Sequence, residues 1–330
     1  MCHIKPVDFL THRPVGRTSL NVLCLLPVNE TQSERLRAAV PADTVTFVDR
    51  DVVSDEHIAA ADVIIGNLAP ARLKAAQNLR LFQLNSAGYD KYAAPGIVPE
   101  SAIMACATGA YGQSVSEHMF AMVLAMMKRL PAYRDCQREH DWRDLGPVTT
   151  FVDAQVLVLG AGDIGTHFAT LASAMGAHVT GMRRSAVEQR APYERMATMD
   201  ALYEELGRAD IVFSILPSCD ATRGLANEKF FAACQPGALF ANGGRGDLVV
   251  TSDLIAALES GHIAGAALDV TSPEPLPAND TLWDAPNCFI TPHVSGWYHL
   301  PITLENILDI AIENLHHLAA GEPIRNAVTL

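Results

Sequence analysis

The sequence predicts an α/β protein with two doubly wound parallel sheets. Short apolar runs alternate with helical patterns through the first hundred residues, and a second alternation begins near residue 155. Such alternation is typical of parallel strands with helices on both faces of the sheet. The chain has 330 residues, which exceeds the size at which a single hydrophobic core stops growing. We therefore expect two domains.

The first alternation supplies five expected strands with helical stretches between them. The strands are short apolar runs, whereas the helical stretches repeat apolar residues at helical spacing. The strands are expected at 22–26, 45–48, 63–65, 81–84 and 103–106, and the helices near 30–39, 56–60 and 70–76. This order predicts a first, flavodoxin-like sheet.

A long apolar helix is expected next, from Ser114 to Leu130. Ser114 and Glu117 have the spacing of a capping box. The segment 119–127 is apolar on every side, which predicts burial all round the helix, as between two domains. We expect its methionines to pack rather than to bind a ligand. A polar helix near 133–141 follows.

The second alternation predicts a nucleotide-binding half with six strands. They are expected at 156–159, around Val179, and at 211–216, 239–242, 263–269 and 288–291. A last amphipathic helix, near 301–318, comes after this sheet is complete, and we expect it to return to the first domain. The predicted division is 1–108 with 299–330 for a discontinuous substrate domain, and 109–298 for the nucleotide domain.

A glycine-rich loop joins the first strand of that half to its helix. Strand 156–159 leads into Gly160-Ala161-Gly162-Asp163-Ile164-Gly165, and a helical pattern follows. Gly160 allows a tight turn, Gly162 lets a pyrophosphate approach the backbone, and Gly165 lets the helix pack closely. The helix N-terminus supplies N–H groups and a positive dipole end for phosphate. The motif alone is weak, but its strand–loop–helix context predicts a Rossmann dinucleotide site rather than a structural turn.

The residues after the second strand favour NADP(H) over NAD(H). An NAD site needs an acidic residue there to accept hydrogen bonds from the ribose 2′-hydroxyl. This chain has Arg183, Arg184 and Ser185 instead. Two guanidiniums and a hydroxyl can bind a 2′-phosphate through charge-assisted hydrogen bonds. Two merely solvated arginines are the alternative, so NAD(H) stays possible.

Composition and cysteine usage indicate a cytoplasmic protein. The net charge of −13 argues against binding to nucleic acid or to anionic membranes. The seven cysteines form no C-x-x-C pair or metal-ligand cluster, which fits reduced thiols, and we expect no metal. Residues 1–11 show no secretion signal, and the apolar run 119–127 is far shorter than the about 20 residues of a membrane span.

Polar residues at the expected strand ends are candidates for chemistry, because ligands of doubly wound sheets bind at the carboxyl ends of the strands. Arg245 could clamp a substrate carboxylate, and Asp269 could accept a hydrogen bond from the nicotinamide carboxamide. Glu274 lies between two prolines, and His293 ends the last strand. A histidine oriented by a carboxylate could supply the proton that hydride transfer to a ketone requires. An ion-pair arginine, a capping aspartate and a buried core histidine are the structural alternatives.

Four ordered motifs resemble the D-isomer-specific 2-hydroxyacid dehydrogenases. They are Gly160-x-Gly162-x-x-Gly165, Asn242-x-x-Arg245-Gly246, Asp269-Val270 with Glu274-Pro275, and Pro292-His293. The resemblance implies that Arg245 binds a 2-oxoacid, that His293 is the acid/base and that Glu274 is its partner. It also implies a homodimer.

The resemblance implies further binding residues. Ala87 and Gly88 match a loop whose N–H groups bind the substrate carboxylate, although Ser86 stands where Gly is common. Further cofactor contacts are expected from Leu216, Pro217, Thr222, Gly243, Asp269, His293 and Gly296. Gly243-Gly244 departs from the family's arginine turn, where a small side chain is more usual. Arg183 occupies the place of the aspartate of NAD-dependent members, which agrees with NADP(H).

The substrate side chain is left open. Tyr111 and Tyr298 lie in segments that the family places around the cleft between its domains, and aromatic rings there would favour a bulky 2-oxoacid. The same residues could be packing residues, and glyoxylate or hydroxypyruvate would then compete. We expect an NADP(H)-dependent 2-oxoacid reductase. A nucleotide-sensing corepressor on the same fold is the main alternative, and a formate- or phosphite-oxidising relative is another.

Overall fold

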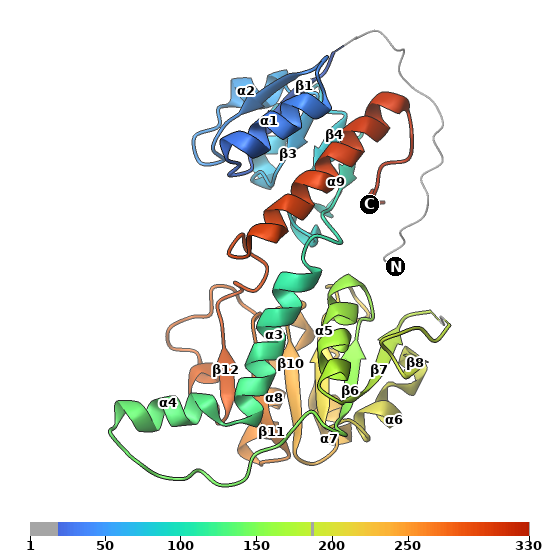
Figure 1. The fold of residues 1–330 in the computed structure, drawn as a ribbon. Coiled ribbons are helices and arrows are strands. Elements are labelled where there is room, and N and C mark those ends of the chain that lie inside the picture. The colour runs from blue at the N-terminus through green and yellow to red at the C-terminus, as the bar shows by residue number, and fades with distance from the viewer. Residues whose placement is uncertain (1–18, 186–187, 330) are drawn as a thin grey trace. The chain divides into compact units, whose positions relative to one another are not determined.

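The computed structural model describes residues 19–185 and 188–329, which form two compact units (Figure 1). The first unit ends at Tyr111 and resumes at Tyr298, and the second unit spans Gly112–Trp297. Each contains one sheet whose strands are all parallel, so the predicted two-sheet α/β class is confirmed. Cys2 and the expected absence of a secretion signal in residues 1–11 lie outside the described residues.

The first unit is built on a five-stranded sheet of order β2-β1-β3-β4-β5. The strands are β1 (Asn21–Cys24), β2 (Thr44–Phe47), β3 (Val63–Ile65), β4 (Leu81–Gln83) and β5 (Ile103–Ala105). The helices are α1 (Glu30–Ala39), α2 (Asp55–Ala60), η1 (Pro70–Ala75), η2 (Asp90–Tyr92) and α9 (Pro301–Ala320). All five predicted strands are present. The predicted helix at 70–76 is a 3₁₀ turn.

Helix α9 completes the first unit, although it follows the second unit in the chain. Buried Asn314 donates to Gln83 Oε1 at the end of β4, at 2.6 Å. Glu305 pairs with Arg35 of α1 at 2.8 Å. A buried amide pair of this kind must be satisfied internally, so Asn314 fixes how the helix lies against the strands.

The second unit is built on a seven-stranded sheet of order β12-β11-β10-β9-β6-β7-β8. The strands are β6 (Gln155–Leu159), β7 (His178–Arg183), β8 (Arg195–Thr198), β9 (Ile211–Ser214), β10 (Ala238–Asn242), β11 (Ile263–Leu268) and β12 (Cys288–Ile290). The predicted count of six strands is wrong, because β8 was missed. None of its four residues is fully buried, so this edge strand lacks the apolar run by which the others were found.

Helices cover both faces of this sheet. The helices of this unit are α3 (Gly112–Met127), α4 (Leu130–Arg138), α5 (Asp163–Ala174), α6 (Leu202–Leu206), α7 (Glu228–Ala233) and α8 (Thr251–Glu259), with 3₁₀ turns η3 (Met199–Ala201), η4 (Gly246–Leu248) and η5 (Thr281–Asp284). Helix α4 projects away from the sheet (Figure 1). Phe168 of α5 stacks on Phe213 of β9, with ring centroids 4.1 Å apart. Burial of such aromatic faces stabilises the helix layer on the sheet.

Helix α3 differs from its prediction in length and burial. It ends at Met127 rather than Leu130, and Arg129, with a left-handed φ of 56°, separates it from α4. Pro131 then occupies the first turn of α4, where its missing N–H costs nothing. The helix is not buried all round, because Ala121 is exposed and Leu124 is half-buried.

No described helix combines the length and apolarity needed to span a membrane. Within the same part of the chain, no cluster of three histidine, cysteine or acidic side chains is arranged to hold a metal ion.

Candidate active site

The polar residues singled out in the sequence follow the ends of three neighbouring strands in the second unit. Arg245 follows β10, Asp269 follows β11, and His293 follows β12. Strands β10, β11 and β12 are adjacent and parallel, so their carboxyl ends share one edge of the sheet. Ligands of doubly wound sheets bind at this edge.

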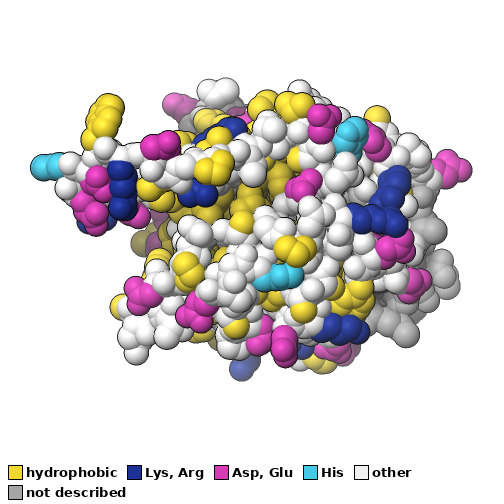
Figure 2. Space-filling view, turned by 90° about the horizontal axis from the view of Figure 1, so that it is seen from below, with side chains coloured by type: hydrophobic (Ala, Val, Ile, Leu, Met, Phe, Trp, Pro, Cys, Tyr) yellow, Lys and Arg dark blue, Asp and Glu magenta, His cyan; other side chains and the backbone are white. Residues whose placement is uncertain are grey.

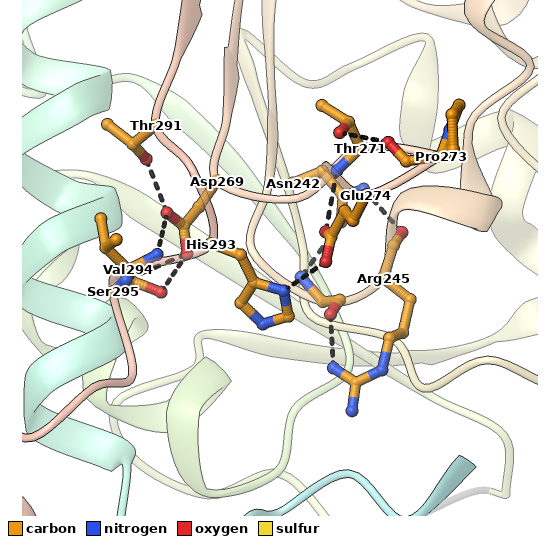
Figure 3. A network of polar contacts seen from close by, with 11 residues as sticks. Asn242, Arg245, Asp269, Thr271, Pro273, Glu274, Thr291, His293, Val294 and Ser295 are labelled. Carbon is orange, nitrogen blue, oxygen red and sulfur yellow. Dashed lines mark hydrogen bonds and ion pairs between the residues drawn. The ribbon is translucent and has the colours of Figure 1, made fainter. Parts of the chain in front are cut away.

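His293 and Glu274 form a hydrogen-bonded pair (Figure 3). The His293 Nδ1 atom lies 2.8 Å from Glu274 Oε2, and the other carboxylate oxygen accepts from the Thr271 N–H at 3.1 Å. An ionised carboxylate only accepts hydrogen bonds, so Nδ1 bears a proton. The Nε2 edge of the ring is therefore left to exchange a proton with a ligand.

The environment of Glu274 favours its ionised form. Partial burial on its own would raise the pKa of this carboxyl. The hydrogen bond and charge of His293, the Thr271 N–H and the charge of Arg245 together outweigh burial and lower the pKa below its usual value. Glu274 is thus an anion at neutral pH, and it can orient the imidazole.

Asp269 holds the turn that presents His293. Its carboxylate is 1% exposed and accepts hydrogen bonds from Thr291 Oγ1 (2.6 Å), Val294 N (3.0 Å), Ser295 N (3.1 Å) and Ser295 Oγ. The His293 N–H donates to the Asp269 backbone oxygen at 2.7 Å. His293 itself has a left-handed φ of 52°, which costs a non-glycine residue roughly 1–2 kcal/mol. The Asp269 contacts offset this strain.

His118 of α3 extends this network, and its role was not predicted from the sequence. Its Nε2 atom lies 3.0 Å from Thr291 Oγ1 and 3.7 Å from Asp269 Oδ1. The Thr291 hydroxyl donates to Asp269, so His118 Nε2 is the donor to Thr291. That Asp269 accepts a hydrogen bond from the nicotinamide carboxamide stays a prediction. Within the chain, the Asp269 side chain binds the residues of the His293 turn.

The arginine turn is fixed by Asn242, which is fully buried. Asn242 Nδ2 donates to the Arg245 backbone oxygen at 2.9 Å, and its Oδ1 accepts from the Gly244 N–H at 3.1 Å. A Cβ atom on Gly244 would lie 2.6 Å from the Leu216 backbone oxygen. The second glycine of this turn is therefore explained by close approach of the β9 loop. In Figure 3 the Arg245 guanidinium and the Nε2 edge of His293 point to the same side of the network.

The glycine loop has the structure that a dinucleotide requires. Gly160 has a left-handed φ of 104°, and a Cβ on Gly165 would lie 2.1 Å from the Gly160 oxygen. A Cβ on Gly162, the N-cap of α5, would meet nothing within 4 Å. An open pocket of about 320 Å³ lies there, lined by Gly162, Asp163, Thr166, His167, Arg190 and Ala191. The exposed helix N-terminus and this space fit the phosphates of the cofactor.

Arg183 is the last residue of β7 and is half-buried, whereas Arg184 and Ser185 are exposed. Strand β7 pairs with β6, so Arg183 ends beside the glycine loop. Arg190 was not predicted. Its guanidinium donates to the Ala161 oxygen at 3.1 Å and lines the pocket. The sequence feature that could have indicated it is a second arginine, after Arg184, in the segment that follows β7.

Other predicted residues lie in loops at strand ends. Leu216 and Pro217 follow β9, and Thr222 closes that loop by donating from Oγ1 to the Pro217 oxygen at 2.6 Å. Ile164 lies in the first turn of α5. Gly243 follows β10, and Gly296 follows the His293 turn.

The expected carboxylate-binding residues belong to the first unit. Ala87 and Gly88 are half-buried in the loop after β4, and Ser86 Oγ donates to the Gly88 oxygen at 2.6 Å. Tyr111 and Tyr298 also belong to this unit. Their hydroxyls hydrogen-bond Asn85, a residue for which no role was predicted.

Comparisons with known proteins give a consistent result. The sequence profile "D-isomer specific 2-hydroxyacid dehydrogenase, NAD binding domain" matches residues 120–295. Glyoxylate/hydroxypyruvate reductase A of Photorhabdus laumondii is 31% identical over 230 residues, which cover 69% of this chain and 71% of the relative.

Two solved structures extend the similarity to nearly the whole chain. A D-isomer specific 2-hydroxyacid dehydrogenase family protein from Aeromonas salmonicida has a TM-score of 0.83 at 30% identity and covers 94% of this chain and 99% of that chain. A D-isomer specific 2-hydroxyacid dehydrogenase from Xanthobacter autotrophicus, solved with NADPH and MES, has a TM-score of 0.78 at 28% identity and covers 94% and 98%.

Proposed function

The chain belongs to the D-isomer specific 2-hydroxyacid dehydrogenases, and on that premise we propose that it reduces 2-oxoacids to D-2-hydroxyacids with NADPH. Membership makes it an NAD(P)-dependent oxidoreductase and confirms the resemblance found in its motifs. The observation that supports the proposed reaction is the His293–Glu274 pair, 2.8 Å apart, at the carboxyl edge of the second sheet.

His293 is the proposed acid. Its imidazolium, held through Nδ1 by Glu274, donates the Nε2 proton to the carbonyl oxygen of the substrate. The nicotinamide, when bound, supplies the hydride that C2 receives, so the ketone is reduced and the cofactor oxidised. In the reverse direction His293 accepts the hydroxyl proton as a base.

Arg245, Ala87 and Gly88 are the proposed ligands of the substrate carboxylate. Arg245 can form a bidentate pair with a carboxylate, and its turn is fixed by Asn242. Ala87 and Gly88 contribute backbone N–H groups from the first unit. Glyoxylate and hydroxypyruvate are the substrates we propose first, because the Photorhabdus relative is named for them.

We propose NADP(H) as the preferred cofactor, with NAD(H) as the weaker one. Arg183 at the end of β7 and Arg190 at the pocket place two guanidiniums near the glycine loop. Guanidiniums favour a 2′-phosphate over a 2′-hydroxyl. The Xanthobacter relative was solved with NADPH, which agrees with this preference.

A homodimer in the cytoplasm completes the proposal. Large exposed apolar side chains gather between 130 and 152, namely Leu130, Trp142, Val148 and Val152. Figure 2 shows apolar side chains in a hollow beside a projecting segment on the face seen from below. We propose that these exposed side chains form part of the dimer interface. Light scattering that gave a monomer mass at micromolar concentration would contradict the dimer.

Product identification tests the proposed reaction. Protein, NADPH and hydroxypyruvate should give the D-isomer of the hydroxyacid on chiral chromatography. Tight NADPH binding without product from any 2-oxoacid would favour the nucleotide sensor. Consumption of NADP⁺ with formate or phosphite would favour an oxidising relative.

A further inference from the structure

We propose that Asn85 is a positioning residue for the substrate carboxylate loop, and that Tyr111 and Tyr298 act through Asn85 rather than on the substrate side chain. The inference rests on the proposed function, because it assumes that the Ala87 and Gly88 N–H groups bind the carboxylate. All of the residues that carry it belong to the first unit.

Asn85 is paired reciprocally with Asn67. The two residues follow β4 and β3, which are neighbouring strands. The Asn67 N–H donates to Asn85 Oδ1 at 2.6 Å, and the Asn85 N–H donates to Asn67 Oδ1 at 3.1 Å. Asn67 Nδ2 also donates to Ser86 Oγ at 3.0 Å. This double bridge fixes the backbone immediately before Ala87.

Two tyrosines satisfy the remaining groups of Asn85. The Tyr111 hydroxyl donates to the Asn85 backbone oxygen, and Asn85 Nδ2 donates to the Tyr298 hydroxyl. Burial raises the pKa of both phenols, so both remain protonated at neutral pH. Asn85 thereby uses its backbone N–H, its backbone oxygen and both ends of its side chain within this unit.

The positions of the two tyrosines in the chain make this arrangement informative. Tyr111 is the last residue of the first unit before the chain enters the second, and Tyr298 is the first residue after it returns. Both points where the chain passes between the units are therefore hydrogen-bonded to one asparagine. That asparagine lies two residues before the first proposed N–H donor, Ala87.

A residue that fixes this loop acts on the carboxylate, which all 2-oxoacids share. Loss of a Tyr–Asn85 hydrogen bond should therefore raise KM by a similar factor for glyoxylate and for phenylpyruvate. A tyrosine that lined the side-chain pocket would instead change the ratio between these two substrates, because glyoxylate has no side chain.

The test uses Tyr111→Phe, Tyr298→Phe and Asn85→Ala in the full-length protein, with glyoxylate, hydroxypyruvate and phenylpyruvate as substrates. Tyr92→Phe is the matched control. The Tyr92 hydroxyl is buried in the same unit and donates to a backbone oxygen at 2.8 Å, but that oxygen belongs to Leu68 and not to Asn85. It reports the effect of losing a buried tyrosine hydroxyl as such.

We expect each of Tyr111→Phe and Tyr298→Phe to raise KM about three- to tenfold for every 2-oxoacid, with a smaller change in kcat and an unchanged Kd for NADPH. Tyr92→Phe should leave KM near the wild-type value. In the Asn85→Ala background, Tyr298→Phe should add little, because it has lost the group through which it acts.

A KM effect confined to phenylpyruvate, or an undiminished Tyr298→Phe effect in the Asn85→Ala background, would overturn the inference. Normal KM values in both tyrosine variants would do so as well. Failure of the wild-type protein to reduce any 2-oxoacid is a separate outcome. It would refute the proposed function and, with it, this inference.

Discussion

The turn around His293 is held by groups from two consecutive strand ends, whereas the loop after Asn85 depends on a side chain 213 positions away. In the second unit, Asp269 after β11 binds Thr291, Val294 and Ser295 after β12. In the first unit, Asn85 is bound by Tyr298, at which the chain returns from the second unit.

The two regions have different proposed roles: the His293 turn orients the proton donor, and the Asn85 loop positions the substrate carboxylate. A proton donor needs one defined ring orientation, which local contacts to Glu274 and Asp269 provide. A loop that binds the group shared by all substrates can instead be tied to the segments where the chain changes unit. Variants of the His293 turn should therefore affect mainly kcat, and variants of the Asn85 loop mainly KM.

Among variants of the His293 turn in the second unit, His293→Ala should lower kcat the most. Loss of the proton donor should lower kcat about 10²- to 10⁴-fold, with little change in NADPH affinity. Steady-state kinetics and NADPH fluorescence titration measure the two quantities. Full turnover near neutral pH would remove His293 from the mechanism.

Glu274→Gln should come next. Gln keeps an oxygen that can accept from His293 Nδ1 but lacks the negative charge, so the hydrogen bond is no longer charge-assisted and kcat/KM should fall about 10- to 10²-fold. Steady-state kinetics with NADPH and hydroxypyruvate measure this value. An unchanged kcat/KM would show that Glu274 does not assist His293.

The Glu274 carboxyl also determines how the activity of the wild-type protein should change with pH on the acid side. The pKa of Glu274 lies below the usual value of a glutamate, because His293, the Thr271 N–H and Arg245 outweigh partial burial, so its pairing is fully present above that usual value. The stabilisation is lost only as the pH falls through the lower, folded-state value. Loss of activity through this carboxyl at pH 5 to 6 would contradict the pairing.

Arg183→Ala changes a residue that belongs to neither turn. Loss of a charge-assisted hydrogen bond should raise KM for NADPH about tenfold and leave KM for NADH and for the 2-oxoacid unchanged. Arg208→Ala is a control, since its guanidinium pairs with Glu204 at 2.6 Å in the same unit. Equal effects on both cofactors would refute a 2′-phosphate contact.

Ser295→Ala should give the smallest effect. It removes the donor from Ser295 Oγ to Asp269 but keeps the backbone contacts of the turn. We expect the free energy of unfolding, measured by urea denaturation, to fall by about 1 kcal/mol. We also expect a modest fall in kcat. A rise in KM with unchanged kcat would contradict the assignment of this turn to chemistry.

The fold was largely predictable because both sheets are built from buried apolar strands. Strand β3 has the predicted bounds, Val63–Ile65, and all three residues are buried. Strand β8 was missed because an edge strand with partly exposed residues has no continuous apolar run. The prediction that α3 is buried all round was wrong, because an apolar composition does not specify which face of a helix packs against a neighbour. Exposed Ala121 is an example.

The candidate site divides in the same way. His293 and Glu274 could be proposed because they lie in motifs that resemble those of the family, and the structure brings them together. Asn85 and His118 could not, because their importance depends on partners that only the folded chain brings near. Hydrogen bonds between residues far apart in sequence leave no local pattern.

The most direct test of the central claim is absorbance at the reduced-nicotinamide band. Wild-type protein would receive NADPH or NADH with glyoxylate, hydroxypyruvate, pyruvate, 2-oxoisocaproate and phenylpyruvate in turn. We predict rapid oxidation of NADPH with at least one 2-oxoacid and slower oxidation of NADH. Stable absorbance of both cofactors across the whole panel, in protein shown to bind NADPH, would contradict the account and favour a nucleotide sensor.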